Sequence, residues 1–335
     1  MRRSRLSALT AVVAVIGASL LGASTATAAP AAASADSATG YVVLAKSGAS
    51  AAALAKQLTA AGATVSTVNE AIGMVVVSAA PSGFLASVRS NAAVDSAAAN
   101  GLVGRSPMAG KAKDRVLREN AEAPASAGAA ERADVSADPL DSYLWGMRMM
   151  NVPQAHAITL GDKRVKVGVM DTGVEGSHPD LAANFDSALS RNFTTDMVDV
   201  DGPCEFDGCK DPANVDDNGH GTHVAGTIAA AKNDFGLSGV APEVGIVNVR
   251  AGQDSGYFFV GPVANALTYS GDAGLDVVNM SFYVDPWLYN CEGGAPEDSP
   301  EEAAEQDLII KTMRRALNYA HSKGVTLVGA LGNNH

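Results

Sequence analysis

The stretch Asn218-Gly-His220-Gly-Thr-His223-Val-Ala-Gly-Thr227 is the most informative part of this sequence. An apolar run follows His220, which predicts a helix with this histidine at its head, and the small residues around it let another molecule's backbone approach. A second stretch, Val165-Lys-Val-Gly-Val-Met-Asp171-Thr-Gly, alternates in polarity and ends on a carboxylate. It predicts a strand with Asp171 at its carboxyl end. A buried carboxylate orients a histidine and stabilises its charged form, so the pair suits general-base chemistry.

The region around these motifs, residues 139–335, alternates between predicted strands and helices. The strands are Val165–Met170, Val244–Val249, Leu275–Met280 and Val325–Leu331. The helices lie near residues 220–231, 257–271 and 302–323. Strands separated by helices predict an α/β fold, a mainly parallel sheet with helices on both faces. Ligands bind at the carboxyl ends of the strands in such sheets, which is where Asp171, Ser281 and Asn333 lie.

A smaller region with another pattern comes first in the chain. Its predicted elements are strand Tyr41–Ala45, helix Ala51–Ala61, strands Ala63–Val68 and Gly73–Ser78, a short helix from Pro81 to Ser90, and a last strand Val94–Val103. This βαββαβ order predicts a small α+β, ferredoxin-like domain over residues 40–104. Residues 105–138 are rich in Ala and charged residues with few large apolar ones, which predicts a linker.

The N-terminus has the features of a secretory signal peptide. Basic residues come first, an apolar stretch from Leu6 to Ala23 follows, and Ala26-Thr-Ala28 matches a cleavage site. We expect residues 1–28 to be removed and the protein to be secreted to the extracellular side. A second apolar run of spanning length is absent from the sequence, which predicts no membrane span. The formal net charge of −12 argues against nucleic-acid binding.

Three cysteines are consistent with an oxidising compartment. Cys204 and Cys209 are close enough in sequence to close a small loop, so we expect a disulfide between them. Cys291 is left over. Its partner lies outside the 335 residues, or it is a free thiol.

The two opening motifs together resemble those of the subtilisin-like serine proteases, the subtilases. Asp-Thr-Gly alone is typical of a strand-ending turn and also occurs in aspartic proteases. His178-Pro-Asp180-Leu, however, follows Asp171 within ten residues and matches the subtilase pattern. Asp171 and His220 also stand in the family's chain order, Asp then His then Ser. The resemblance implies a serine endopeptidase acting on a peptide or protein substrate, with His220 as the base, Asp171 as its partner and no cofactor required.

The third member of the triad is not found in these residues. The family's nucleophile lies in a Gly-Thr-Ser stretch, whereas the Gly-Thr pairs here are followed by His223 and Ile228. We therefore expect that the chain is C-terminally incomplete and inactive alone. The alternative is a non-catalytic truncated or degenerate relative that binds peptides or acts as a propeptide-like inhibitor. A Gly-Thr-Ser in a continuing reading frame would decide for the enzyme.

The resemblance also implies roles for residues at the other strand ends. Asn333 resembles the asparagine that donates to the oxyanion, although an Asn after a strand is most often a turn residue. Ser281 resembles the serine on the strand that pairs with the substrate backbone. Phe282 and Tyr283 stand where the family commonly has smaller residues, so we expect them to contribute to substrate binding and to narrow or redirect the cleft.

Further expectations follow from the resemblance and from the residues themselves. The domain at residues 40–104 has the position of a subtilase propeptide, an intramolecular inhibitor and folding assistant; an unrelated small module is the alternative. Acidic residues between Asp199 and Asp217 are candidates for structural calcium, with no ligands assigned, against the alternative of a solvated loop. His178 and His223 have structural positions. A metal site on His220 and His223 is disfavoured, because the zincin motif needs a Glu between histidines four apart, so we expect no metal there.

Overall fold

The computed structural model describes residues 39–106, 137–282 and 290–330. Its first sheet has four antiparallel strands in the order β2-β3-β1-β4. The elements of this domain are β1 (Thr39–Ala45), α1 (Ala51–Ala60), β2 (Thr64–Asn69), β3 (Met74–Ala79), α2 (Phe84–Arg89) and β4 (Val94–Ala99). This is the predicted βαββαβ order. Helix α1 begins where Ser50 accepts from the amide of Ala53 and Glu70 accepts from those of Ala51 and Ala52, which satisfies its first free N–H groups.

The strand predicted over Val94–Val103 is in fact two strands with different partners. Strand β4 ends at Ala99, and β5 (Leu102–Arg105) pairs antiparallel with β9 (Tyr257–Phe259), far along the chain. Residues 100–101 separate the two strands, and a Cβ on Gly101 would clash with the Glu305 carboxylate. The prediction was wrong here because an apolar pattern indicates a strand without specifying its partner.

The second sheet is parallel throughout, in the order β11-β10-β6-β8-β7. Its strands are β6 (Lys166–Val169), β7 (Arg191–Asn192), β8 (Gly245–Arg250), β10 (Val277–Met280) and β11 (Thr326–Gly329). This confirms the predicted α/β fold with a parallel sheet. All five strands run in one direction, so their carboxyl ends lie along a single edge.

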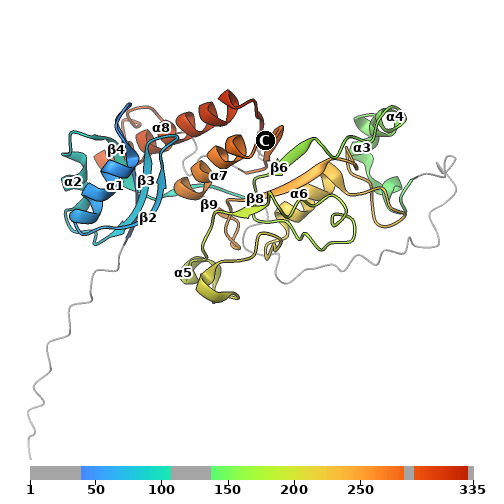
Figure 1. Ribbon diagram of the computed structural model, residues 1–335, viewed down its shortest axis with the longest axis horizontal. Helices are drawn as coiled ribbons and strands as arrows, with labels where there is room; N and C mark the ends of the chain where they lie inside the picture. Colours follow the sequence, from blue (N-terminus) through green and yellow to red (C-terminus); the bar gives the residue numbers. More distant parts are fainter. Residues whose placement is uncertain (1–38, 107–136, 283–289, 331–335) are drawn as a thin grey trace, which may run out of the picture. The chain divides into compact units, whose positions relative to one another are not determined.

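Helices cover both faces of the parallel sheet (Figure 1). The long ones are α6 (His220–Ala229), α7 (Val260–Asp272) and α8 (Pro300–Ser322). The helix predicted from residue 257 begins only at Val260, because residues 257–259 form β9. Shorter elements are η2 (Asp141–Tyr143), α3 (Trp145–Met149), α4 (Val152–His156), α5 (Val198–Asp201) and η3 (Asp207–Cys209). Among the described residues, no helix is both long and apolar enough to cross a membrane.

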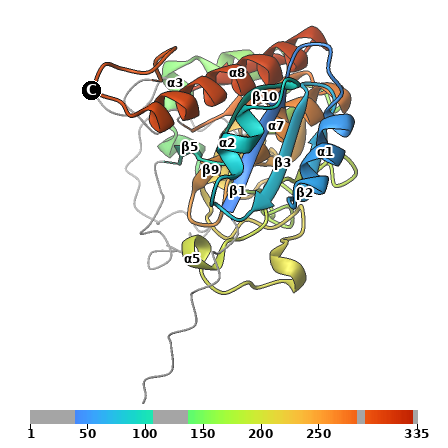
Figure 2. The same ribbon diagram turned by 90° about the vertical axis from the view of Figure 1, so that its left-hand side faces the viewer.

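Successive side chains of a strand point to opposite faces of its sheet, and in both sheets the two faces pack against different helices. In β8, Ile246 packs with Ala225 and Ala229 of α6, whereas Val247 and Val249 pack with α7 and α8. The antiparallel sheet divides in the same way: Val42 and Leu44 of β1 join the α7 and α8 core. Tyr41 and Val43, on the other face, pack against α1 and α2, which lie in front of β1 and β3 in Figure 2. Helices α7 and α8 are therefore packed between the two sheets.

Candidate active site

Asp171 lies just beyond the carboxyl end of β6, as the sequence predicts. Its backbone carbonyl accepts from the amides of Ala251 and Gly252, both at 3.0 Å, which joins the end of β6 to the end of β8. The side chain has no exposed surface. One carboxylate oxygen, Oδ1, accepts from the amide of Thr172 at 2.7 Å. A buried carboxylate at this edge of the sheet is therefore held in a fixed orientation.

His220 is the first residue of α6 and is almost completely buried. Its Nδ1 lies 2.7 Å from Oδ1 of Asp171, so the structure brings together the two residues that the sequence singled out. Gly219 precedes the helix with φ +91°, a left-handed conformation that glycine adopts without strain. A Cβ on Gly221 would clash with the carbonyl oxygen of Gly173. A residue without a side chain is therefore needed at position 221 because the chain's own backbone passes close to it, and not only to let another molecule approach.

Asp216 holds the start of α6 beside the Asp171 and His220 pair, and the sequence reasoning missed it. Its carboxylate accepts from the amides of Gly219 (3.0 Å) and Thr222 (2.9 Å) at the start of α6. It also accepts from the hydroxyl of Thr172 at 2.9 Å, next to Asp171. An acidic side chain here satisfies free N–H groups and is favoured by the helix dipole. Asp216 lies three residues before Gly219, the residue that directly precedes the helix, so a search for a capping side chain at that position does not find it.

The two buried groups change each other's protonation. Burial by itself lowers the pKa of His220, but the hydrogen bond and negative charge of Asp171 outweigh it, and the pKa of His220 is raised. For Asp171, burial is the largest effect and raises the pKa of the carboxyl, against the hydrogen bond from His220. The imidazolium form of His220 is thus stabilised, as a group that accepts a proton during a reaction requires.

The residues predicted to bind substrate are only partly placed. Ser281 follows β10, is half-buried, and accepts from the side-chain amide of Asn279 at 2.8 Å. Phe282 is 3% exposed and stacks on Phe258 with ring centroids 4.0 Å apart. This differs from the expectation that its bulk narrows the cleft, because the ring fills the core instead. Tyr283 and Asn333 lie outside the described residues.

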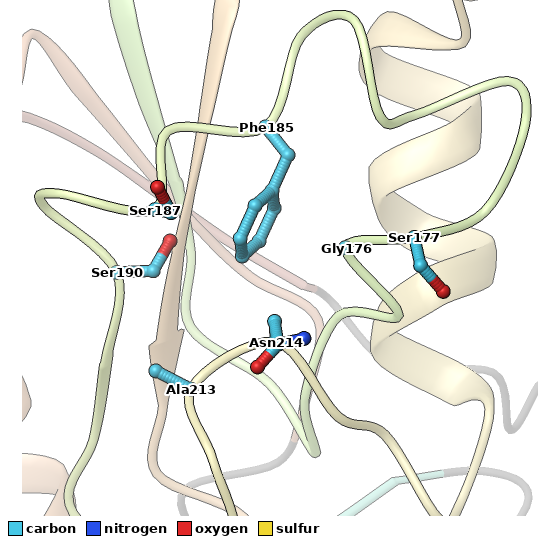
Figure 3. Close-up of a pocket in the computed structure, with 7 residues that line it drawn as sticks. All are labelled: Gly176, Ser177, Phe185, Ser187, Ser190, Ala213 and Asn214. Atoms are coloured by element: carbon cyan, nitrogen blue, oxygen red, sulfur yellow. The ribbon is translucent and has the colours of Figure 1, made fainter.

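His178 and His223 lie beside α6 in a pocket whose lining includes neither Asp171 nor His220. His223 is exposed, and this pocket has a volume of about 270 Å³. Within the described part of the chain, the groups of three carboxylate, imidazole or thiol ligands that lie close together contain no histidine. A larger pocket of about 410 Å³ is lined by seven residues (Figure 3). They are Gly176, Ser177, Phe185, Ser187, Ser190, Ala213 and Asn214. None of them titrates near neutral pH, so this pocket supplies no acid or base.

The acidic segment before His220 folds around a buried arginine, Arg250, at the end of β8. Its guanidinium donates to Asp211 (2.6 Å) and Asp254 (2.5 Å) and lies 3.7 Å from Asp196. Burial and the nearby Asp211 charge raise the pKa of Asp196 to about 6, against the effect of Arg250. Cys204 and Cys209 in this segment form a disulfide, with Cα atoms 4.9 Å apart, and Cys291 is free.

These carboxylates have the donor chemistry of a site for a hard divalent cation. Several of their buried oxygens have no hydrogen-bond partner among the described residues. Two sets of three acidic residues bring ligand oxygens within 4.8 Å of one another. Calcium prefers carboxylate and other oxygen ligands of this kind, so the residues present fit such an ion.

Comparison with known proteins identifies the family to which this chain belongs. The chain is 34% identical over 189 residues to the Major intracellular serine protease of Bacillus subtilis (strain 168), covering 56% of this chain and 49% of the relative. It is 35% identical over 192 residues to Subtilisin Savinase of Lederbergia lenta, covering 57% and 56%. For Thermitase of Thermoactinomyces vulgaris the identity is 34% over 200 residues, covering 58% of each. The chain thus spans about half the length of the curated relatives it matches.

Solved structures share the fold. The epidermin leader peptide processing serine protease EpiP of Staphylococcus aureus matches with a TM-score of 0.63 at 19% identity, over 89% of this chain and 60% of that one. Fervidolysin of Fervidobacterium pennivorans matches with a TM-score of 0.56 at 22% identity, over 89% of this chain and 40% of that one. Residues 162–335, more than half of the chain, match the family model described as the subtilase family. The chain therefore belongs to the subtilase family of serine peptidases.

Proposed function

We propose that this protein is the precursor of a secreted serine endopeptidase in which His220 is the general base and Asp171 its buried partner. The observation that carries the proposal is the 2.7 Å contact between His220 Nδ1 and Asp171 Oδ1 in a chain of the subtilase family. The substrate class is a peptide or protein, and the reaction is acyl transfer from the peptide to a serine and then to water.

The proposed roles follow from the geometry of the pair. Asp171 occupies Nδ1 of His220, so Nε2 is the ring nitrogen that takes the proton from the attacking serine and returns it to the leaving amine. Asp171 stabilises the imidazolium that forms between these two transfers. Asn333 is the proposed oxyanion donor, and Ser281 belongs to the strand that pairs with the substrate backbone. This chemistry needs no cofactor.

The reaction also needs a serine, and none of the 335 residues stands in a Gly-Thr-Ser context. We therefore propose that these residues alone do not hydrolyse peptide bonds, and that the same chain extended by a serine-bearing subtilase segment does. A fluorogenic peptide assay and a phosphonate active-site label test both forms. We expect turnover and labelling only in the extended form. Stoichiometric labelling of a serine in the 335-residue form would show that the nucleophile is among these residues.

Residues 40–104 are the proposed propeptide, an intramolecular inhibitor that also assists folding. Arg315 of α8 donates to the backbone carbonyls of Ala45 and Ile72 and pairs with Asp95 at 2.6 Å. On α7, Asn265 and Thr268 accept from Asn69 at 2.9 and 2.8 Å. The likeness to EpiP covers 89% of the chain, more than residues 139–335 alone account for. These contacts support a domain that packs on the peptidase helices before processing.

Maturation and export are part of the same proposal. Signal cleavage after Ala28 and a second cut within about residues 104–140 would release the peptidase domain. N-terminal sequencing of secreted protein checks both positions. Recovery of active enzyme with residues 40–104 still covalently attached would contradict the propeptide role, and an intact residue 1–28 segment would contradict export by this route.

A second candidate function is peptide binding without catalysis. Assays of the extended form distinguish peptide binding alone from peptidase activity. Peptide binding without turnover, in an extended form with its serine in place, would support a non-catalytic relative. Turnover that is abolished by His220→Ala would support the peptidase.

A further inference from the structure

The pocket of about 410 Å³ has neither Asp171 nor His220 in its lining. Its volume lies within the range of roughly 300–1,000 Å³ that is typical of small-molecule sites. We call it the Phe185 pocket, and its lining consists of Gly176, Ser177, Phe185, Ser187, Ser190, Ala213 and Asn214. None of these side chains carries a charge, so a charged ligand would find no opposite charge in the lining. The pocket therefore suits a neutral ligand.

The ring of Phe185 supplies an apolar surface in this pocket. It projects toward the segment that carries Ala213 and Asn214, as Figure 3 shows. A Cβ on Gly176 would come within 2.7 to 3.0 Å of three carbon atoms of the ring. Gly176 does not have a positive φ, so its backbone conformation does not require glycine. The absence of a side chain at position 176 instead gives the ring its place in the pocket wall.

Two polar side chains of the lining are available to a ligand. The hydroxyl of Ser187 and the side-chain amide of Asn214 are exposed and have no hydrogen-bond partner among the described residues. The hydroxyl of Ser190, in contrast, donates to the carbonyl of Asp186 and accepts from the amide of Asn248. A hydroxyl and a carboxamide can each donate and accept, which matches a ligand whose own hydroxyl groups do both.

Hydrogen bonds to the backbone connect the walls of the pocket to one another and to β8. The amide of Gly176 donates to the carbonyl of Asn214 at 3.0 Å, and that of Asp186 donates to a carbonyl of β8 at 2.8 Å. The side-chain amide of Asn248, on β8, donates to the carbonyl of Ala213 at 2.8 Å. The pocket is thus formed before a ligand arrives, so little binding free energy is lost in ordering it.

We propose that the Phe185 pocket binds a neutral sugar, either free or as one unit of a glycan. A pyranose ring has an apolar face of C–H groups and a rim of hydroxyl groups. The apolar face packs on the ring of Phe185, and the hydroxyls bond to Ser187 and Asn214. The proposal does not depend on the proposed peptidase function, because the pocket shares no residue with the Asp171 and His220 pair.

The experiment is a titration of the 335-residue chain with methyl β-D-glucopyranoside, followed by NMR of the backbone amides. We expect shifts at the amides of the lining residues, with a Kd on the order of 1–10 mM, as befits so small a ligand. Phe185→Leu should weaken binding roughly three- to tenfold, because leucine has no flat face. Phe206→Leu makes the same change at an exposed phenylalanine outside the pocket. It is the matched control and should bind like the wild type.

Asn214→Ala tests the polar side of the pocket. Its side chain is exposed, so the variant should fold, and the loss of one hydrogen bond should weaken binding roughly two- to tenfold. If Phe185→Leu does not fold, Asn214→Ala takes its place. An unchanged affinity in every variant of the pocket that folds would overturn the proposal.

Retention on insoluble cellulose distinguishes the two sources of the sugar. Retention that methyl β-D-glucopyranoside competes away identifies a glycan as the ligand, and binding in the NMR titration without retention identifies a free sugar. Absence of shifts in the pocket at about 100 mM glucoside would overturn the proposal. So would equal or tighter binding of glucuronate, because an uncharged lining does not favour an anionic sugar. Neither measurement uses peptidase activity, so failure here is distinguishable from failure of the proposed function.

Discussion

Two sites of buried charge lie at the same edge of the parallel sheet, and they are built in opposite ways. At the end of β6, Asp171 has one ionisable partner, His220, and its Oδ1 also accepts from the amide of Thr172, while its Oδ2 has no hydrogen-bond partner among the described residues. At the end of β8, Arg250 faces more carboxylates than it can neutralise, and several of their oxygens have no partner. The difference teaches that burial alone does not identify a catalytic pair: at β6 one carboxylate meets one imidazole, whereas at β8 several carboxylates share one guanidinium that is always charged.

The largest expected effect tests the Asp171 and His220 pair, by His220→Ala in the chain extended by a serine-bearing subtilase segment. We expect kcat to fall by roughly 10⁴- to 10⁶-fold, the range found in serine proteases, this family among them, when a triad member is removed. His223→Ala, one helical turn further along α6, is the matched control and should retain activity when folded. Peptidase kinetics with circular dichroism measure both. Equal losses in two folded variants would contradict the assignment of roles.

The partner in this pair is tested by Asp171→Asn. Its kcat should fall by about 10⁴-fold, because the amide no longer fixes the working tautomer. The pKa of His220 should also fall below its ordinary value, since burial remains while the stabilising charge is gone. NMR titration of the imidazole in the 335-residue chain measures this without any nucleophile. An unchanged His220 pKa would show that Asp171 does not control it.

The raised pKa of His220 also determines how folding stability depends on pH. The folded pKa of His220 lies above its unfolded value of about 6.5. The stability that the pair contributes is therefore fully present below that pH and is lost as pH rises through the folded pKa. Asp171→Asn should reverse the sign of this dependence, because the folded pKa of His220 would then lie below the unfolded value.

The second site is tested by Arg250→Met. This change keeps much of the side-chain volume but leaves the surrounding carboxylates without a cation, so in EGTA we expect the free energy of unfolding to fall by about 3–5 kcal/mol. Urea unfolding measures it. Asp196→Asn under the same conditions should lose nothing. A similar loss in both variants would mean that Arg250 balances the charge of the carboxylates around it and that the contrast with the Asp171 pair is false.

The smallest expected effect concerns the start of helix α6. Asp216→Ala removes the cap of α6, for which we expect a loss of about 1–2 kcal/mol in unfolding free energy. Asp199→Ala, at an exposed position in the same acidic segment, should change stability by less than about 0.5 kcal/mol. Equal effects of the two substitutions would show that the carboxylate of Asp216 does not hold the helix start.

Much of the fold was predictable because its signals are local. The alternating runs ending near Met170, Val249 and Met280 predict strands, and the structure has β6, β8 and β10 there. Helix α6 begins at His220 as expected. Periodicity is a property of neighbouring residues in the sequence, so it does not depend on contacts with distant parts of the chain. The roles of Asn333 and Tyr283, the signal peptide and the processing site stay predictions.

The sequence by itself determined the order of strands and helices, the family, and the candidates Asp171 and His220, because motif and periodicity are read within a few residues. Only the tertiary structure decided which side chains meet across long separations. It paired β5 with β9, buried Phe282 against Phe258, and placed Asp216 against Thr172. It also enclosed Arg250 among acids from two segments. The physical reason is that burial and charge pairing depend on the folded neighbourhood, which no local pattern of apolar and charged residues specifies.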